Sequence, residues 1–399
     1  MRIAYINHGR FPTEKAHGFQ IAQVCDAMTE LGHDVTLLNP VFRNPVTASA
    51  REHYGLRHPV HTQPLRHFDA FRSLVIPGFL GFLVSMISYA KAVRAYLRSN
   101  RFDVLYLRSP LLLQAALRAG MPVIMELHAL PRFMRARFVR RCNRCARIVC
   151  LTTPMCDELV GWGVHPAIVI VEADGVDLRR FENLPSLDKL RMTWQLPSDR
   201  PVIGYVGSLA TRETLEKGMR ELIDAYAKLK IDPSASSGEK LKIFLWVVGG
   251  PQKWIDIYKV QASSIGLSTD QIHFEGRIAA ADVPSAIAAC DICVYPAPKT
   301  DHPYFLRDTS PLKLFEYLAA GRPVICADIP PVRDVVDEKS VKFFAPGDSQ
   351  DLAAAMKDVL DHPEEAARRA GEGKRIVQEH SWEKRMGRIL KGISDTMVS

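Results

Sequence analysis

Short apolar runs alternate with helical patterns along the 399 residues of this chain, in two successive sets. Such alternation is typical of parallel sheets covered by helices. In the first half the runs predict strands near residues 2–7, 34–39, 104–109, 122–127, 147–152 and 168–172. In the second half they predict strands near residues 201–208, 242–249, 272–276, 292–297, 323–327 and 341–345. The sequence therefore predicts an α/β protein with two doubly wound, Rossmann-like domains facing each other across a cleft.

A polar stretch punctuated by prolines, residues 178–201, separates the two sets of strands. We therefore expect an N-terminal domain over residues 1–180 and a C-terminal domain over residues 200–380. In doubly wound sheets a ligand binds outside the carboxyl ends of the strands. A ligand of this protein should then lie in the crevice between the two domains.

The composition is that of a globular protein, with 47% apolar and 24% charged residues. The chain begins MRIAYINHGR and enters a strand pattern directly, so we expect no signal peptide and a cytoplasmic location. Eight cysteines fit a reducing compartment. Two C-x-x-C pairs, Cys142 with Cys145 and Cys290 with Cys293, lie in a helical run and beside a strand, so we expect no zinc site.

The net charge of +8 is unevenly distributed. Residues 1–200 hold 26 Lys and Arg against 16 Asp and Glu, a balance of +10, and the remainder holds 26 against 28, a balance of −2. The basic first half favours an anionic acceptor or membrane surface over general binding of nucleic acid.

The segment 308–327, DTSPLKLFEYLAAGRPVICA, places two carboxylates, Asp308 and Glu316, across the start of a predicted helix. Ser310 suits the N-cap and a proline follows it, so this helix should begin near residue 310 and stop at Gly321. Eight residues of loop and helix span roughly 10 to 12 Å, about the distance from the sugar to the ribose of a nucleotide sugar.

The backbone around Thr309, Ser310 and Leu312, at the helix start, offers N–H groups to which a diphosphate could bind. A purely structural interpretation also exists for Glu316. It lies at the edge of the buried stripe of the helix and could be an ordinary, half-exposed glutamate.

The D-x7-E spacing, with SPLKLFEYLAAGRPV around it, resembles the E-x7-E signature of retaining glycosyltransferases of family 4, which have the two-Rossmann GT-B fold. The resemblance implies transfer of a sugar from a UDP- or GDP-sugar to a glycan, lipid or small-molecule acceptor. Asp308 is shorter than the usual glutamate but can still accept sugar hydroxyls. The final segment, residues 381–399, resembles the helix that in this fold crosses back onto the first domain.

The resemblance extends to two positions in the first half. His128, delivered by the strand in IMELHALP, matches the active-site histidine beside the transferred sugar; otherwise it is a polar loop residue. Relatives often have Gly-Gly at the turn into the first helix, where backbone N–H groups approach the donor. Here the pair is His17 and Gly18, so only Gly18 matches, and a plain βαβ turn explains it equally well.

In the second half, Lys217 matches the lysine that neutralises the leaving diphosphate in the family's E-K-G stretch. The family's arginine is replaced by Ser208, and Arg212 is the candidate substitute, or else a solvated loop residue. The segment HFEGRI resembles the loop that meets the nucleotide base, around Arg277 and Ile278. No D-x-D motif follows a strand, so the resemblance implies a metal-independent enzyme without a cofactor.

Seven arginines lie between residues 132 and 147 without an acidic residue, and as one helix they would place six arginines on one half. Such a helix could bind anionic lipid or be a solvated surface. The uncharged run at residues 74–90 is interrupted by Pro77 and two glycines, which favours a buried or interfacial helix over a membrane span. Peripheral attachment to the inner face of a membrane is therefore an open alternative.

Two other classes of function fit parts of this pattern. One is a different GT-B enzyme, such as a nucleotide-sugar epimerase. The other is a non-catalytic binder of nucleotide sugar or RNA, suggested by Asp308, Ser208 and the arginine run.

Overall fold

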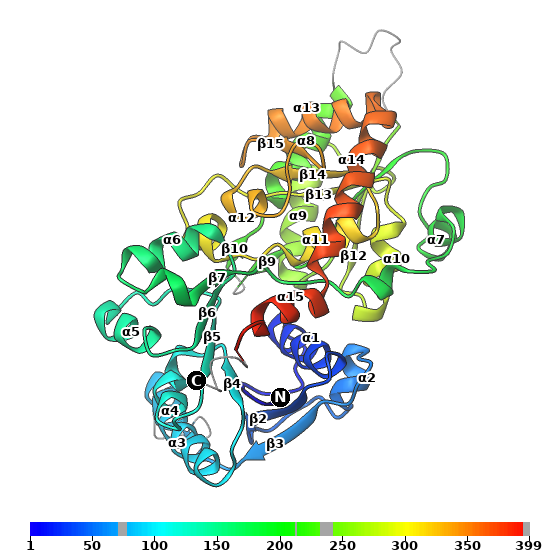
Figure 1. The fold of residues 1–399 in the computed structure, drawn as a ribbon. Coiled ribbons are helices and arrows are strands. Elements are labelled where there is room, and N and C mark those ends of the chain that lie inside the picture. Colours follow the sequence, from blue (N-terminus) through cyan, green and yellow to red (C-terminus); the bar gives the residue numbers. More distant parts are fainter. Residues whose placement is uncertain (71–77, 212–213, 232–241, 394–399) are drawn as a thin grey trace. The chain divides into compact units, whose positions relative to one another are not determined.

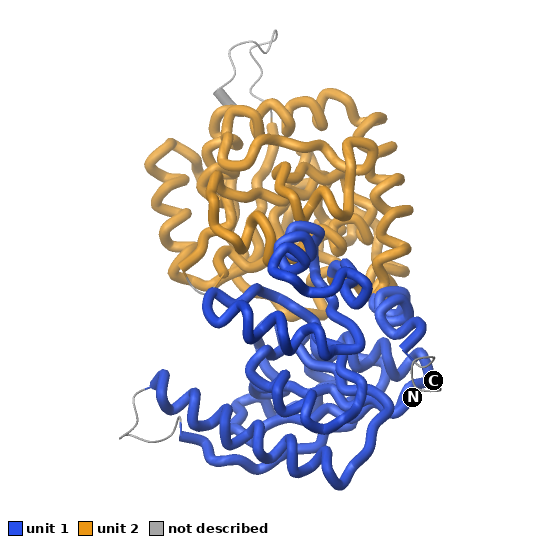
Figure 2. Tube along the Cα trace, turned by 60° about the vertical axis from the view of Figure 1, so that its left-hand side comes forward, with its two compact units in different colours: residues 1–173, 382–399 blue, residues 174–381 orange. Residues whose placement is uncertain are grey.

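The computed structural model describes residues 1–70, 78–211, 214–231 and 242–393 (Figure 1). The chain forms two compact units (Figure 2). Unit 1 contains Met1–Ala173 and the chain from Trp382 onward, and unit 2 contains Asp174–Ser381. The division after Ala173 falls earlier than residue 180, where the sequence placed the end of the first domain, and the C-terminal segment belongs to unit 1.

Unit 1 is built on a seven-stranded parallel sheet in the order β3-β2-β1-β4-β5-β6-β7. The strands are β1 (Arg2–Ile6), β2 (Asp34–Pro40), β3 (His61–Leu65), β4 (Val104–Leu107), β5 (Val123–Leu127), β6 (Arg147–Cys150) and β7 (Val169–Val171). The sequence missed only β3, an edge strand that buries just Leu65 and contains Pro64. A strand with one buried side chain shows no apolar run, so sequence pattern cannot reveal it.

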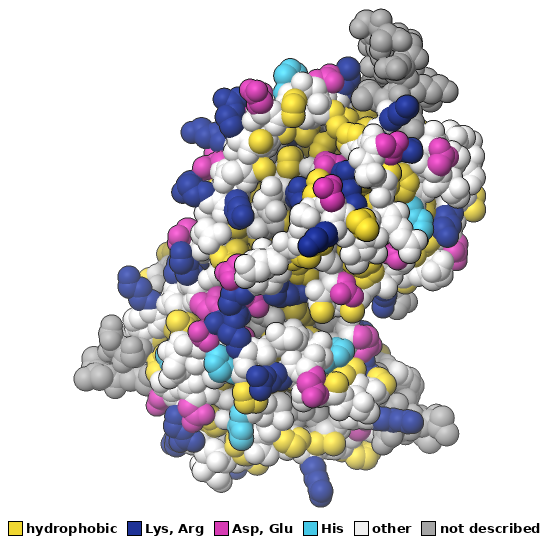
Figure 3. All heavy atoms as spheres, turned by 90° about the vertical axis from the view of Figure 1, so that its right-hand side faces the viewer, with side chains coloured by type: hydrophobic (Ala, Val, Ile, Leu, Met, Phe, Trp, Pro, Cys, Tyr) yellow, Lys and Arg dark blue, Asp and Glu magenta, His cyan; other side chains and the backbone are white. Residues whose placement is uncertain are grey.

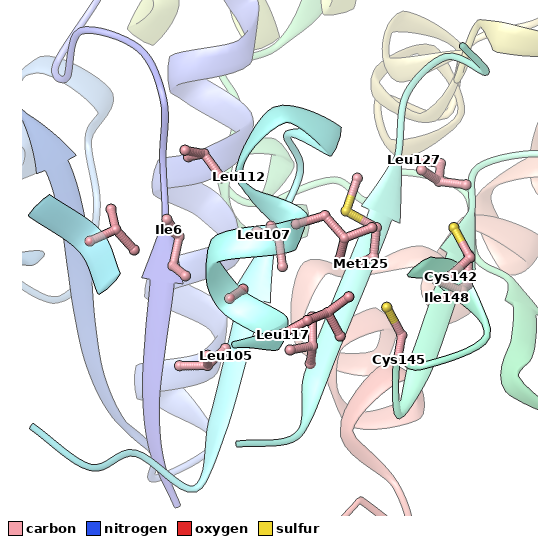
Figure 4. Packing of buried hydrophobic residues seen from close by; sticks show 14 of the residues in the cluster. Ile6, Leu105, Leu107, Leu112, Leu117, Met125, Leu127, Cys142, Cys145 and Ile148 are labelled. Carbon is pink, nitrogen blue, oxygen red and sulfur yellow. The ribbon is translucent and has the colours of Figure 1, made fainter. Parts of the chain in front are cut away.

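Helices cover both faces of this sheet (Figure 1). They are α1 (Ala16–Glu30), α2 (Ala50–Tyr54), α3 (Gly78–Ser99), α4 (Pro110–Leu117), α5 (Arg135–Cys142), α6 (Thr153–Gly161) and α15 (Trp382–Leu390). Figure 4 shows Leu105, Met125 and Ile148 of three neighbouring strands packed in one core with Cys142 and Cys145. Burial raises the pKa of the Cys142 thiol to about 12, so this C-x-x-C pair is part of the apolar core.

Unit 2 is built on a six-stranded parallel sheet in the order β12-β11-β8-β13-β14-β15. Its strands are β8 (Val202–Val206), β11 (Phe244–Val248), β12 (Ile272–Gly276), β13 (Ile292–Tyr295), β14 (Val324–Ala327) and β15 (Lys342–Phe344). A short antiparallel hairpin, β9 (Ala210–Thr211) and β10 (Leu215–Glu216), follows β8. The predicted α/β class with two parallel-sheet, Rossmann-like domains is confirmed.

The helices of unit 2 are α7 (Leu187–Thr193), α8 (Met219–Ile231), α9 (Gln252–Ser264), α10 (Val283–Ala288), α11 (Leu312–Ala319), α12 (Pro330–Arg333), α13 (Ser349–Asp361) and α14 (Pro363–Ile376). The helix α8 packs between α9 and α13, and α11 packs against α14. On the face in Figure 3, positive and negative side chains are interspersed.

The arginine-rich segment 132–147 is not one helix, which corrects the prediction. Only Arg135–Cys142 is helical, because Met134 before it has a left-handed backbone with φ of 59°. After Cys142 the chain turns, and at Arg147 it pairs with β5 as the start of β6. Sheet pairing overrides the helical pattern of the arginines.

The apolar run predicted at residues 74–90 falls partly in α3, and residues 74–77 lie outside the described part of the chain. Across the described ranges, no helix combines the length and apolar character needed to cross a membrane.

Within unit 1, α15 packs against α1, and a buried ion pair joins α15 to the sheet. Arg385 is fully buried, and its Nη2 lies 3.0 Å from Oε2 of Glu126 in β5. Its Nε donates to the carbonyl of Ala173 at 2.6 Å. Burial opposes ionisation of Glu126, but Arg385, then His128 and Arg108, hold its pKa well below the usual range.

We predict that Arg385→Leu destabilises the protein by about 3 kcal/mol at pH 7, the lower end of the range for breaking a buried pair, because His128 and Arg108 still face Glu126. Urea unfolding followed by tryptophan fluorescence measures the loss. The control Arg388→Leu removes the partly exposed pair with Glu172 and should cost less than about 1 kcal/mol.

The same experiment has a second control and a pH dependence. The double variant Glu126→Leu/Arg385→Leu should recover part of the loss, because it leaves no buried charge without its partner. A depressed carboxyl pKa contributes stability fully above the ordinary value of about 4.3, and the contribution disappears as the pH falls through the folded value. A gap between wild type and Arg385→Leu that does not narrow in acid would contradict this account.

Candidate active site

In each sheet the strand order reverses at one point, where a doubly wound fold opens a binding crevice beside the carboxyl ends of the strands. In unit 1 this point lies between β1 and β4, and in unit 2 it lies between β8 and β13. The predicted site residues are distributed over these two edges.

The segment that leads into α11 differs from its prediction at Ser310. The helix begins at Leu312, and Ser310 is not its cap, because the Ser310 hydroxyl accepts the backbone N–H of Asp174 at 2.8 Å. The Leu312 N–H donates to the Ser310 carbonyl at 2.9 Å. The helix ends at Ala319, two residues before Gly321 with φ of 66°, close to the predicted stop.

Asp308 ends a π-helical turn, Tyr304–Asp308, just before α11. Its carboxylate is 13% exposed and is held by the neighbouring Arg307, whose Nε lies 2.6 Å and Nη2 3.1 Å from the two carboxylate oxygens. A ligand hydroxyl at this place would meet an arginine–carboxylate pair.

Glu316 lies on α11 with 22% of its side chain exposed. Its ionic partner Arg180 stands at 3.8 Å, beyond hydrogen-bond distance. Burial raises the pKa of Glu316, although Arg180 opposes the shift. Hydrogen bonds donated by ligand hydroxyls would stabilise the charged form of this partly buried carboxyl group. Such a group is therefore suited to bind hydroxyls.

Lys217 lies between the β9–β10 hairpin and α8. Gly218 after it has φ of 79°, and a Cβ there would lie 2.7 Å from the backbone nitrogen of Ala297, so only glycine permits this close approach. Burial raises and Lys217 lowers the pKa of the Tyr304 phenol, and the net direction is downward. The Ser208 hydroxyl donates to the Ala210 carbonyl. Arg212, the candidate substitute cation, lies outside the described residues.

One residue of this edge was missed by the sequence analysis. Lys313, in the first turn of α11, donates from Nζ to the Tyr205 hydroxyl at 2.8 Å and lies 4.2 Å from the centre of the Tyr205 ring. The Tyr295 ring centre is 4.8 Å away. Lys313 stands three residues before Glu316, a spacing that places both on one side of the helix, and this signal could have identified it.

Arg277 and Ile278 follow β12, two strands away from β8 in the sheet. Arg277 is exposed and Ile278 is half-buried. Glycines bring these strand ends close: a Cβ on Gly249 would collide with the Gly207 carbonyl, and one on Gly250 would lie 2.9 Å from Cγ of Arg277. A ligand reaching from Arg277 to α11 would cross the ends of β11 and β8.

In unit 1, His128 directly follows β5, and its Nε2 pairs with Oε1 of Glu126. The sequence analysis missed Glu126, which is fully buried and also accepts a hydrogen bond from the Tyr106 hydroxyl. Arg108, after β4, is 3.8 Å from the same carboxylate. The imidazole of His128 is therefore oriented by a buried carboxylate.

Gly18 lies within α1 and not at the turn before it. Its N–H donates to the Lys15 carbonyl at 2.9 Å, and a Cβ would collide with Thr13 and the Tyr54 hydroxyl. Close packing accounts for this glycine. Nearby, burial and then Arg108 lower the pKa of His17 to about 4, so this part of the edge carries a neutral imidazole.

A cavity of about 530 Å³ lies beyond the ends of β13, β14 and β15. Lys299, Asp301, Phe305 and Asp348 are among the residues that line it, and none of the predicted site residues is.

Comparison with known proteins gives matches over most of the chain. Residues 18–180 match the family model described as "Glycosyltransferase Family 4", and residues 200–362 match "Glycosyl transferases group 1". A GDP-mannose-dependent alpha-mannosyltransferase of Mycolicibacterium smegmatis is 24% identical, covering 84% of this chain and 82% of the relative. An MMP alpha-(1->4)-mannosyltransferase of Mycolicibacterium hassiacum is 23% identical, covering 96% and 95%.

Solved structures show the same fold. HepE of Anabaena in complex with UDP and glucose has a TM-score of 0.71 at 20% identity, covering 100% of this chain and 99% of that chain. WaaG, a glycosyltransferase involved in lipopolysaccharide biosynthesis, has a TM-score of 0.65 at 16% identity, covering 98% and 100%.

Proposed function

The chain belongs to glycosyltransferase family 4, and from this premise we propose that it transfers a sugar from a UDP- or GDP-sugar with retention of configuration and without a metal ion. The observation that carries the proposal is the group of charged residues beside the strand ends of unit 2. Asp308 precedes α11, α11 carries Lys313 and Glu316, and Lys217 lies near Lys313. Relatives named for GDP-mannose and neighbours solved with UDP support a nucleotide-sugar donor. The acceptor is a hydroxyl of a glycan, lipid or small molecule.

Each group has a role in this proposal. Glu316 accepts the ribose hydroxyls, and Lys217 with the backbone around Thr309 and Ser310 binds the diphosphate. Asp308, held by Arg307, and His128, held by Glu126, contact the transferred sugar. Arg277 and Ile278 meet the base, and Gly18 stays assigned to the donor side, where close packing also requires a glycine.

The chemical step is a front-face displacement. The bond between the anomeric carbon and the phosphate oxygen breaks, its electron pair stays on the diphosphate, and the acceptor oxygen bonds to the same face of that carbon. The acceptor proton passes to the departing phosphate oxygen. Cations beside the diphosphate stabilise the charge that develops on it, and this electrostatic contribution is often the largest in catalysis.

Family membership supports one of the functions that the sequence left open. Both family models describe glycosyltransferases, so the chain is an enzyme of this class. This favours transfer over epimerisation or non-catalytic binding of a nucleotide sugar or RNA.

The roles of the acidic residues predict different defects. Glu316→Ala should weaken binding of the bare nucleoside diphosphate about ten- to a hundredfold, because hydrogen bonds to a charged group contribute about 1.5 to 3 kcal/mol. Asp308→Ala and His128→Ala should leave that affinity nearly unchanged and lower turnover. Calorimetry with UDP and GDP, together with initial rates on the full donor, measures both quantities.

Glu364→Ala, in the exposed first turn of α14, is the matched control and should change neither quantity. If Glu316→Ala binds the diphosphate as well as wild type, or Asp308→Ala loses that binding, the assignment of the donor along α11 is wrong.

We predict that turnover survives excess EDTA, because lysines and backbone N–H groups take the place of a metal at the diphosphate. Initial rates with and without EDTA, after exhaustive dialysis against the chelator, test this. Loss of turnover that added magnesium or manganese restores would exclude the metal-free mechanism.

We also propose that unit 1 contacts an anionic membrane surface around α5. Phe133 and Met134, just before α5, are 82% and 64% exposed, and Arg137, Arg140 and Arg144 are exposed beside them. Apolar side chains next to arginines suit the boundary between headgroups and acyl chains. The helix α4 packs against α5 and exposes Leu111.

Wild type should therefore sediment with anionic liposomes and much less with neutral ones. Replacing Arg137, Arg140, Arg141 and Arg144 by Gln should abolish the difference, because each arginine near the surface adds about 1 kcal/mol. Gln at four exposed cations of unit 2, Lys253, Lys339, Lys374 and Arg375, changes the net charge equally and should preserve binding. A wild type that ignores anionic liposomes at low salt would show that the arginines are only a solvated surface.

A further inference from the structure

Lys313 is placed as a ligand-binding cation would be, and its side chain is half-buried without the usual compensation by a carboxylate of the described residues. Its ammonium lies against the Tyr205 hydroxyl and the rings of Tyr205 and Tyr295. Within the described ranges, neither Lys313 nor Lys217 has an Asp or Glu within ion-pair distance. A charge that is partly removed from water without an opposite charge is costly, so such a lysine calls for an explanation.

The nearby Lys217 makes it still less favourable to charge Lys313. Burial, and then the charge of Lys217, hold the pKa of Lys313 well below its usual range. Desolvation and the charge of Lys217 thus both oppose protonation of Lys313, and an anion that binds between the two lysines favours the charged form of Lys313. The free protein therefore has an electrostatic preference for an anion at this place.

The location identifies the anion. Tyr205 belongs to β8 and Tyr295 ends β13, so Lys313 lies at the point where the strand order of unit 2 reverses. A Cβ on Gly207, directly after β8, would lie 3.3 Å from Cδ of Lys313. Lys313 is also one helical turn nearer the start of α11 than Glu316, on the same side of the helix. If Glu316 holds the ribose, the next group along the donor at Lys313 is the diphosphate.

We propose that Lys313 binds the diphosphate of the donor opposite Lys217 and supplies the cation that the family pattern places at Ser208. This inference rests on the proposed function and adds a residue that the sequence pattern did not assign. Tyr205 is the positioning residue, since its hydroxyl accepts from Lys313 and donates to the Ser208 carbonyl at 2.6 Å. The ammonium is thereby oriented before the ligand arrives. As the sugar departs, negative charge accumulates on the diphosphate, and both lysines stabilise it.

The test compares ligands that differ only in phosphate. Calorimetry on the full chain measures the affinities of uridine, UMP and UDP, and of guanosine, GMP and GDP. Lys313→Met should lower diphosphate affinity about ten- to a hundredfold and leave nucleoside affinity unchanged, which also shows that the variant is folded. Glu316→Ala should instead weaken the nucleoside and the diphosphate alike.

A proton readout separates a direct contact from a packing effect. Diphosphate binding should favour the charged form of Lys313, so wild type should take up protons on binding, seen in a pH series as a dependence of the binding enthalpy on the buffer. Lys313→Met should take up fewer, and Lys313→Arg should keep most of the affinity without that uptake. The control is Lys339→Met, which should match wild type. Lys339 is exposed and lies just before the edge strand β15.

The outcomes distinguish two failures. If wild type binds UDP or GDP and Lys313→Met binds it equally well, the role of Lys313 is wrong and the proposed function stands. If wild type binds neither diphosphate, the proposed donor and the inference fall together.

Discussion

The first unit depends on one buried ion pair, between Glu126 in β5 and Arg385 in α15. Two charges removed from water are costly unless opposite charges face them, and Arg385 on α15 is the main charge that opposes the cost of burying Glu126. The pair therefore holds together segments 259 residues apart in the chain. It also prepares chemistry, because the other oxygen of Glu126 orients His128. One contact thus joins the stability of the unit to the geometry of a proposed active-site residue.

The second unit holds a half-buried lysine without an opposite charge beside it in the described part of the chain. Lys313 lies among tyrosine hydroxyls and rings, and Lys217 acts on it as a like charge. In unit 1 the protein itself neutralises the buried charge, and the result is a structural anchor. In unit 2, within the residues described, no carboxylate neutralises Lys313. We infer that a bound anion does so instead. Strong perturbation of an ionisable group beside a binding edge often marks function, whereas the same perturbation inside a satisfied pair marks architecture.

Much of the site was predictable from sequence because α11 carries several of its residues in one short segment. Asp308 lies ahead of the helix and Glu316 within it, where that pattern places them. The pattern could not reveal that Arg307 holds Asp308, or that the Ser310 hydroxyl binds the backbone of Asp174 and leaves the helix to begin at Leu312. Each of these two contacts depends on which polar groups lie near the side chain in the folded protein. Gly18 shows the same limit, since its neighbour Tyr54 comes from another helix.

The sequence by itself determined the two parallel sheets, because buried strands must be apolar runs and covering helices must be amphipathic, and both leave periodic signals. It also determined the family, through residues close together in the chain. Only the tertiary structure decided which charges meet. Glu126 looks like one glutamate in an apolar strand and Lys313 like one lysine on a helix, and nothing local says that the first faces Arg385 and the second Lys217. Electrostatic energy depends on the distance between charges and on their burial, and neither quantity can be derived from the order of the residues alone.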